Sequence, residues 1–279
     1  MPPGWRRDEL LLEAHETVRG YELIYQSMKT EGLLSQQELE ARRSRGYKPL
    51  QFDEISVLVA RDGELQVCQG GHRFAIAQAL GIGTVPVWIA GRHSEWSTFR
   101  RRITDMCLAN GGQAPEPLLH PDLANVPADP APRDAFERVR GLLSPRGVIV
   151  DVTPGWGYTA QRCESMELEC VAVARDAEQR EVIERLRVAS CRAFAVEQID
   201  VDQKLEGRAV QAVLALGDVA GLLRSEQWRH RIRALLRACR PAALFVAGAS
   251  EDVALLAEAA ALDGISPVTG PGPTIHRLS

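Results

Sequence analysis

Gly70-Gly71-His72-Arg73 is the stretch whose residue types are best suited to binding an anion. Two glycines allow a tight backbone turn, and apolar residues at helical spacing follow from Phe74 to Leu80. His72 and Arg73 therefore fall in the first turn of a predicted helix, where free backbone N–H groups carry partial positive charge. An imidazole and a guanidinium would add donors suited to phosphate oxygens, so the stretch predicts a phosphate-binding turn.

The same turn also has an ordinary structural interpretation. Arg73 could pair with a carboxylate of its own chain, such as Asp53, Glu54 or Glu64. A cation in the first turn of a helix opposes the macrodipole, so an anionic ligand would stabilise Arg73 there. Both interpretations stay open at this point.

The residues around the turn predict a small α+β unit. Val57 and Val59 alternate with other residues before Asp62-Gly63, and Leu65 and Val67 resume the alternation after it, which is typical of a β-hairpin. Helices are predicted on either side of this hairpin and its following helix, at residues 8–28 with an interruption at Gly20, at Ser35–Arg43, and from Ser94 onward.

Residues from about Pro49 to His93 resemble the ParB/sulfiredoxin superfamily, in which a hairpin leads into a G-x-H-R turn, a helix and a V-P-V strand. The matching pieces here are Gly70-Gly71-His72-Arg73, Ala75–Gly81 and Val85-Pro86-Val87. The resemblance implies that a nucleotide, ATP or CTP with Mg²⁺, binds at Gly70, Gly71, His72 and Arg73. Its members include sulfinic-acid reductases, small-molecule kinases and DNA-partitioning CTPases.

Departures from that superfamily narrow the implied activity. Sulfiredoxins carry a cysteine where this chain has Gly71, which argues against sulfinic-acid reduction. No helix-turn-helix pattern follows residue 93, and a net charge of −4 with a pI near 5.9 does not favour DNA binding.

A phosphotransferase hypothesis is the one that survives best for this unit. His72 and Arg73 would hold the transferring phosphate, and a carboxylate would accept the proton of the acceptor hydroxyl. Asp53, Glu54 and Glu64 are candidate bases that spacing does not separate, and Glu54 joins His72 and Arg73 in the predicted catalytic set.

A proline-rich stretch divides the sequence. Six prolines lie between Pro115 and Pro132, without hydrophobic periodicity, so we predict a first domain at 1–112, a linker at 113–133 and a second domain at 134–279. Strands alternating with helices predict an α/β, doubly wound parallel sheet in the second domain. The strands are expected at 147–151, 168–174, 193–196, 210–216 and 242–247, and the helices at 136–143, 158–166, 176–188 and 226–239.

Residues 136–247 resemble the class I S-adenosylmethionine-dependent methyltransferases. The first strand ends in Asp151 and enters a loop with Gly155-Trp156-Gly157-Tyr158, and Asp200 matches a later acidic position. The resemblance implies that S-adenosylmethionine binds through Gly155, Gly157, Asp176 and Asp200.

This second resemblance also has departures. Thr153 stands where the family has a glycine, and Asp176 comes two positions after the end of its strand. Two interpretations therefore stay open: the domain binds the cofactor, or it is a relic that serves as a scaffold or partner surface.

Composition is that of an ordinary globular protein of 279 residues, with 45% hydrophobic and 25% charged residues. Six cysteines without a C-x-x-C pair predict neither a zinc site nor a disulfide framework, and no metal site is predicted from ligand spacing. No signal peptide or membrane span is visible, so we expect a cytoplasmic protein.

Three functions follow as hypotheses. The first is a nucleotide-binding ParB/sulfiredoxin-like phosphotransferase that carries a degenerate methyltransferase-like domain. The second is an S-adenosylmethionine-dependent methyltransferase with an N-terminal recognition module, and the third is a non-catalytic regulator switched by nucleotide. The partners implied are a nucleotide and an unidentified small-molecule or protein substrate, with a homodimer left open and no role for DNA or a membrane.

Overall fold

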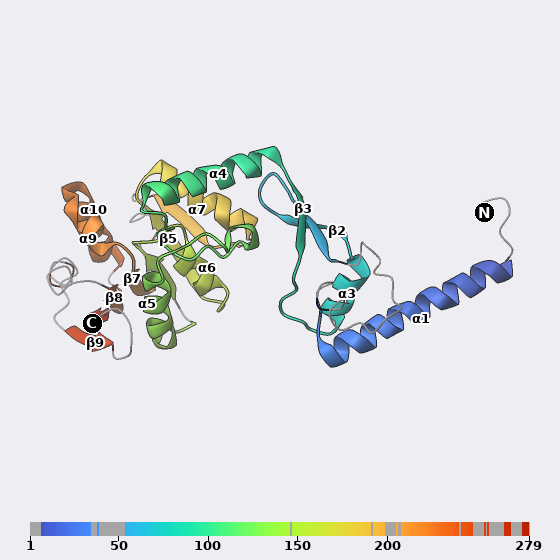
Figure 1. The fold of residues 1–279 in the computed structure, drawn as a ribbon. Helices are drawn as coiled ribbons and strands as arrows, with labels where there is room; N and C mark the ends of the chain where they lie inside the picture. The colour runs from blue at the N-terminus through green and yellow to red at the C-terminus, as the bar shows by residue number, and fades with distance from the viewer. Residues whose placement is uncertain are drawn as a thin grey trace. The chain divides into compact units, whose positions relative to one another are not determined.

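The chain divides into two compact units. The first comprises Met1–Arg61 and Leu65–Ser94, and the second comprises Asp62–Glu64 and Glu95–Ser279 (Figure 1). The structure is a computed structural model and describes residues 7–34, 38, 54–145, 147–190, 192–198, 205, 208–239, 241–247, 254, 256, 265–268 and 275–278.

The first unit is a three-stranded sheet with two described helices longer than one turn. Strand β1 pairs with β2 in antiparallel fashion and with β3 in parallel, in the order β2-β1-β3. Ile55, Val57 and Val59 are buried because they lie on or beside the central strand. The bounds are α1 (Arg7–Glu31), β1 (Ser56–Val59), β2 (Leu65–Gln69), α3 (Gly71–Ala79) and β3 (Trp88–Arg92).

Two local predictions in this unit need correction, and one lies outside the described residues. Helix α1 continues through Gly20, since an exposed helix tolerates a glycine at a cost of about 1 kcal/mol. Val85-Pro86-Val87 precede the strand, which begins at Trp88, because Pro86 has no N–H group for the ladder. Of the predicted helix at Ser35–Arg43, the structure describes Glu38 alone, as helical.

The second unit is a doubly wound α/β fold. Its seven strands follow the order β6-β5-β4-β7-β8-β10-β9. The five strands from β6 to β8 run parallel, as predicted, and β10 is antiparallel to both of its neighbours. The bounds are β4 (Val148–Asp151), β5 (Glu169–Ala174), β6 (Ala195–Gln198), β7 (Val210–Ala215), β8 (Ala243–Ala247), β9 (Ile265–Val268) and β10 (Ile275–Leu278).

Helices cover both faces of this sheet, which is consistent with the Rossmann-like arrangement expected of a methyltransferase-type domain. Val148 and Val150 face the core on one side of the sheet, whereas Ile149 faces the core on the other side. The helices are α5 (Ala131–Val139), α6 (Tyr158–Glu164) and α7 (Ala177–Ala189) on one face, and α9 (Val219–Arg224) and α10 (Glu226–Cys239) on the other.

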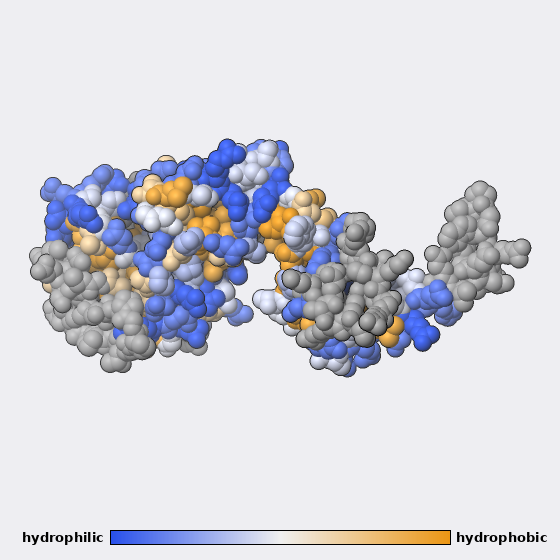
Figure 2. Space-filling model, in the orientation of Figure 1, coloured by the Kyte–Doolittle hydropathy of each residue, from blue (hydrophilic) through white to orange (hydrophobic). Residues whose placement is uncertain are grey.

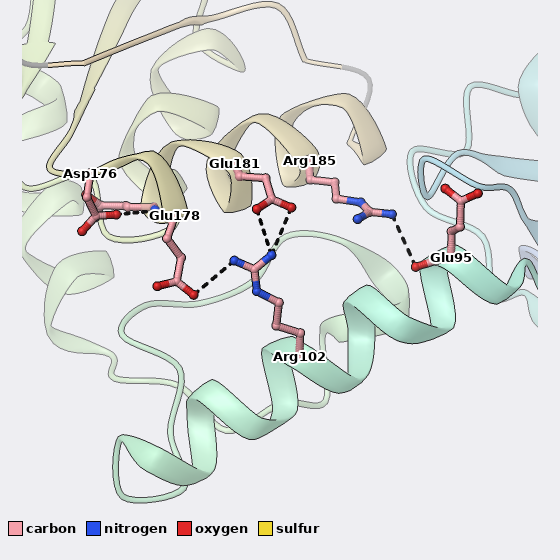
Figure 3. Close-up of polar contacts among 7 residues, drawn as sticks. Glu95, Arg102, Asp176, Glu178, Glu181 and Arg185 are labelled. Carbon is pink, nitrogen blue, oxygen red and sulfur yellow. Dashed lines mark hydrogen bonds and ion pairs between the residues drawn. The ribbon is translucent and has the colours of Figure 1, made fainter.

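Helix α4 (Ser94–Ala109) lies alongside α7. Arg102 of α4 donates to both carboxylate oxygens of Glu181 at 3.0 Å and to Glu178 at 3.1 Å (Figure 3). Trp96 and Phe99 of α4 are buried, while hydrophilic residues cover most of its outer side (Figure 2). The polar contacts therefore hold an amphipathic helix whose last turns border the site described below.

Residues 113–133 form part of the second unit rather than a linker between domains. Ala114 pairs with Ala128 in an isolated parallel bridge, which closes residues 114–128 into a strap. Leu123, the last residue of a short 3-10 helix at Pro121–Leu123 in the strap, is fully buried. The unit boundary falls instead at Ser94 and Glu95. The proline-rich stretch without hydrophobic periodicity is therefore a packed, irregular segment of the second unit.

No helix in the described part of the chain combines the length and apolar content needed to cross a membrane.

Candidate ligand-binding site

A cavity of about 630 Å³ opens at the carboxyl-end edge of the central sheet in the second unit. Residues directly after three neighbouring strands border it: Val152–Trp156 after β4, Arg175 and Asp176 after β5, and Leu216–Asp218 after β7. The chain leaves β4 toward β5 on one side, whereas β7 lies on the other side, so the cavity lies at the switch point of the sheet. The volume is in the usual range for small-molecule sites.

Side-chain hydrogen bonds join the three loops that border the cavity. Gln179 donates from Nε2 to the carbonyl of Gly155 at 2.8 Å, and its Oε1 accepts from the amide of Arg175 at 2.7 Å. Thr153 Oγ1 accepts from the amide of Gly217 at 2.9 Å. These contacts fix the β4, β5 and β7 loops relative to one another, so the cavity is preorganised.

Glu116 of the strap lies against the glycine-containing loop between β4 and α6. Its Oε1 accepts from the backbone amides of Trp156 and Tyr158, each at 2.6 Å. A Cβ atom added at Gly155, where φ is +54°, would come within 2.7 Å of the Glu116 carboxylate. Gly155 therefore leaves room for a carboxylate that the protein itself supplies.

Asp151, at the end of β4, is a second buried carboxylate near Glu116. Its Oδ1 accepts from the amide of Thr153 at 3.0 Å, whereas its Oδ2 has no partner among the described residues. Burial raises the pKa of Asp151 to about 7, although hydrogen bonds from Thr153 and Thr159 oppose the shift.

The pKa of Glu116 is also raised well above its ordinary value, chiefly by burial. Its contacts with the amides of Tyr158, Trp156 and Gly157 oppose this shift, and the nearby Asp151 carboxylate adds to it. Two carboxylates buried this close together favour a proton or another cation between them.

The described lining of the cavity is acidic. It carries five carboxylates and one guanidinium, those of Glu116, Asp129, Asp176, Glu178, Asp218 and Arg175. Asp129, Asp176 and Asp218 each spend one oxygen on a nearby backbone amide, at 2.9, 2.7 and 2.8 Å. The other oxygens leave the site suited to hydroxyl donors and positively charged groups.

Of the cofactor residues predicted for this unit, Gly155 and Asp176 line the cavity. Gly157, with φ of +100°, is the N-cap of α6, and a Cβ there would lie 3.1 Å from Ile183 Cγ2, so it serves packing beneath the loop. Asp200 lies outside the described residues. Trp156 borders the cavity and is 7% exposed, so it is a packing residue.

Glu116 and Gln179 were missed by the sequence analysis. Glu116 comes 40 residues before Trp156, within a stretch that reads as a linker, and nothing local distinguishes it. Gln179 lies in the first turn of α7 after Asp176, where any polar residue is common. The only available signal for Gln179 was its position after a predicted strand.

In the first unit, the glycine turn forms as predicted, but the group that approaches it closely is the backbone carbonyl of Glu54. Gly70 has φ of +71° and is the N-cap of α3. A Cβ at this position would lie 2.7 Å from the carbonyl oxygen of Glu54. Gly71, in contrast, has open space where its Cβ would be. Gly70 is therefore required by close packing of the chain on itself.

The two cationic residues of this turn, His72 and Arg73, contact different groups of the unit. The ring of His72 stacks on Tyr21 of α1, with centroids 4.3 Å apart. Arg73 is buried, 8% exposed, and its guanidinium donates to the carbonyl of Leu34. The described contacts thus give Arg73 a structural role, and the nucleotide site stays a prediction from the sequence.

Of the candidate bases of the phosphotransferase hypothesis, the structure describes Glu54 and Glu64. Glu64 is exposed near the hairpin tip, and its amide donates to Asp62 Oδ1 at 3.1 Å. Asp53 lies outside the described residues, and the backbone carbonyl of Glu54 accepts from Ser56 Oγ at 3.5 Å and lies close to Gly70.

No protein-family model matches this sequence. No curated protein matches it either. Among solved structures, the bifunctional kinase-methyltransferase WbdD is similar at 17% identity and a TM-score of 0.42, covering 63% of this chain and 46% of that one. A methyltransferase from Pyrococcus furiosus is similar at 14% identity and a TM-score of 0.39, covering 67% of this chain and 97% of that one.

A TehB-like SAM-dependent methyltransferase from Corynebacterium glutamicum is similar at 12% identity and a TM-score of 0.38, covering 56% of this chain and 90% of that one. This chain spans less than half of the WbdD structure. Likenesses at this level do not bear on activity, although methyltransferase-fold proteins recur among them.

Proposed function

We propose that the second unit binds S-adenosylmethionine and that the protein is an S-adenosylmethionine-dependent methyltransferase. The observation that carries this proposal is the acidic cavity at the switch point of the sheet, bordered by Gly155 and Asp176. Both residues were expected to contact this cofactor from the sequence resemblance alone. Their placement at one cavity supports the second of the three hypotheses.

The chemistry of the lining fits this cofactor. S-adenosylmethionine carries ribose hydroxyls, a positively charged sulfur and an amino-acid group with both an ammonium and a carboxylate, and when bound it supplies a methyl group for transfer. Asp176 has one oxygen beyond its bond to the Gln179 amide, which suits a hydroxyl donor of the ribose. The carboxylates around it favour a positively charged ligand.

The residues of this chain would bind, orient and shield the ligand. Gln179 and Thr153 fix the loops before the ligand arrives, which lowers the entropy cost of binding. Glu116 of the strap and the adjoining Asp129 border one side of the cavity, and would keep water from the reacting groups.

Binding tests this proposal without any need for a methyl acceptor. We expect S-adenosylmethionine and S-adenosylhomocysteine to raise the melting temperature of the full chain and to give a saturable signal in titration calorimetry. Asp176→Asn should weaken binding by about 10-fold or more, because a charged hydrogen-bond acceptor is lost while asparagine keeps the helix cap. Asp134→Asn, on the exposed side of α5, is the matched control.

The proposal is wrong if the wild-type chain binds neither compound. Unchanged affinity in Asp176→Asn would remove Asp176 from the site while leaving the cavity as the binding place.

A further inference from the structure

The loop between β4 and α6 has already given most of its N–H groups to the protein. Trp156 and Tyr158 donate to Glu116, and the amide of Gly157 donates to the carbonyl of Pro154 at 2.6 Å. Pro154 itself has no N–H group. A glycine loop at a helix start usually offers its amides to an anion, but here an internal carboxylate takes them.

Glu116 is held rigidly in this position. It stands between Pro115 and Pro117, which restrict the backbone on both sides. The amide of Ala114 donates to Pro127 at 2.7 Å, and the amide of Asp129 donates to Ala114 at 3.0 Å, so the strap is closed next to Glu116. The carboxylate is therefore a built part of the site rather than a loosely attached plug.

The second oxygen of Glu116 remains for a ligand. Glu116 lines the cavity, and its Oε2 would lie 2.7 Å from a Cβ at Gly155. The amides of Trp156 and Tyr158 both donate to Oε1, and Oδ2 of the buried Asp151 has no partner among the residues that the structure describes. Buried carboxylate oxygens without donors cost free energy, which a bound cationic donor would relieve.

We propose that Glu116 is a specificity-determining residue that receives the ammonium group of the bound ligand. The carboxylate turns the glycine loop from an anion site into a cation site, so Glu116 binds the ammonium of an amino-acid group and not its carboxylate. This inference rests on the proposed function, because the amine is that of the amino-acid end of S-adenosylmethionine.

A cycle that changes both the ligand and the protein tests the inference. S-adenosylhomocysteine is compared with its deamino analogue, in which hydrogen replaces the amino group, by calorimetry on wild-type protein and on Glu116→Gln. Glutamine keeps an oxygen for the amides of Trp156 and Tyr158, so the variant should fold. Glu137→Gln on α5, outside the cavity, is the matched control.

We expect wild-type protein and Glu137→Gln to bind the deamino analogue about 10- to 100-fold more weakly than S-adenosylhomocysteine, as for a hydrogen bond between charged groups. In Glu116→Gln the two ligands should bind within about 3-fold of each other.

Equal affinities for the two ligands in wild-type protein would overturn the inference while leaving the proposed function intact. A penalty that persists unchanged in Glu116→Gln would also overturn it, since another group would then bind the amine. Failure of both ligands to bind at all would remove the proposed function and this inference together.

Discussion

Each of the two units contains a glycine turn at the start of a helix, and the two turns differ in the groups that lie against them. Gly70 and Gly157 are both left-handed N-caps without a side-chain cap. At the first turn, the nearby cation, Arg73, is buried against a backbone carbonyl. At the second turn, a carboxylate from a distant segment, Glu116, binds the amides.

This difference shows that a glycine turn locates a bend in the chain without specifying a ligand. Left-handed backbone and close approach account for Gly70 through the carbonyl of Glu54, with no ligand required. The second turn lies beside the cavity described above, where five of the six charged lining residues are negative. Chemistry is therefore decided by residues that reach the turn from elsewhere.

The largest expected effect concerns the buried acids of the second turn. The pKa of Asp151 in the folded protein, about 7, lies above its ordinary value of 3.8. The folded state thus holds a proton on Asp151 more tightly than the unfolded state does. The stabilisation that this proton gives the folded state is complete below about pH 4 and is lost as the pH rises through about 7. We expect the free energy of unfolding to fall by up to about 4 kcal/mol over that range.

Urea denaturation at several pH values measures this loss. Asp151→Asn should flatten most of the slope, and Asp134→Asn should leave it unchanged. A wild-type curve without decline between pH 4 and 7 would show that a cation of the protein already neutralises the pair, which would break the contrast between the two turns.

The next effect tests the contact between Gly155 and Glu116. Gly155→Ala should cost about 3 kcal/mol, because it combines a left-handed alanine with a clash against the carboxylate. Gly111→Ala is the matched control: φ is +73° there but the space around its Cβ is open, so we expect about 1 kcal/mol.

Thermal or chemical denaturation gives both costs. In a Glu116→Ala background the further cost of Gly155→Ala should fall to that of Gly111→Ala. If the cost stays near 3 kcal/mol in that background, the carboxylate is not what requires glycine at position 155.

The smallest effect concerns the first turn. Arg73→Met should destabilise the first unit by about 2 kcal/mol, since the Leu34 carbonyl loses a charged donor in a buried setting. Arg19→Met, exposed on α1, is the control and should change stability by less than about 0.5 kcal/mol. Hydrogen exchange at the amides of β1 and α3 in the full chain reports the change, and full protection in Arg73→Met would contradict the structural role.

Regular elements of the second unit could be predicted from sequence because periodicity and strand-like runs are local signals. Helix α10 begins and ends at the predicted residues, Glu226 and Cys239. The short strands β9 and β10 were not predicted, and β9 contains Pro267, which weakens any strand pattern.

Only those residues of the candidate site that lie in loops after strands could be predicted from the sequence. Gly155 and Asp176 were found because the resemblance to methyltransferases implies cofactor contacts in the loops after β4 and β5. Glu116 could not be found, since its partners lie 40 and 42 residues away and its segment has no periodicity. The boundary at 113–133 was misplaced for the same reason, because buried contacts rather than composition join the strap to the second unit.

Calorimetric titration of the full chain with S-adenosylmethionine and, separately, with ATP and Mg²⁺ tests the contrast between the two turns most directly. The account predicts saturable binding of S-adenosylmethionine that Glu116→Gln weakens and Arg73→Ala leaves intact, with no binding of ATP. Binding of ATP that disappears in Arg73→Ala, together with no binding of S-adenosylmethionine, would contradict it and return the active site to the first turn.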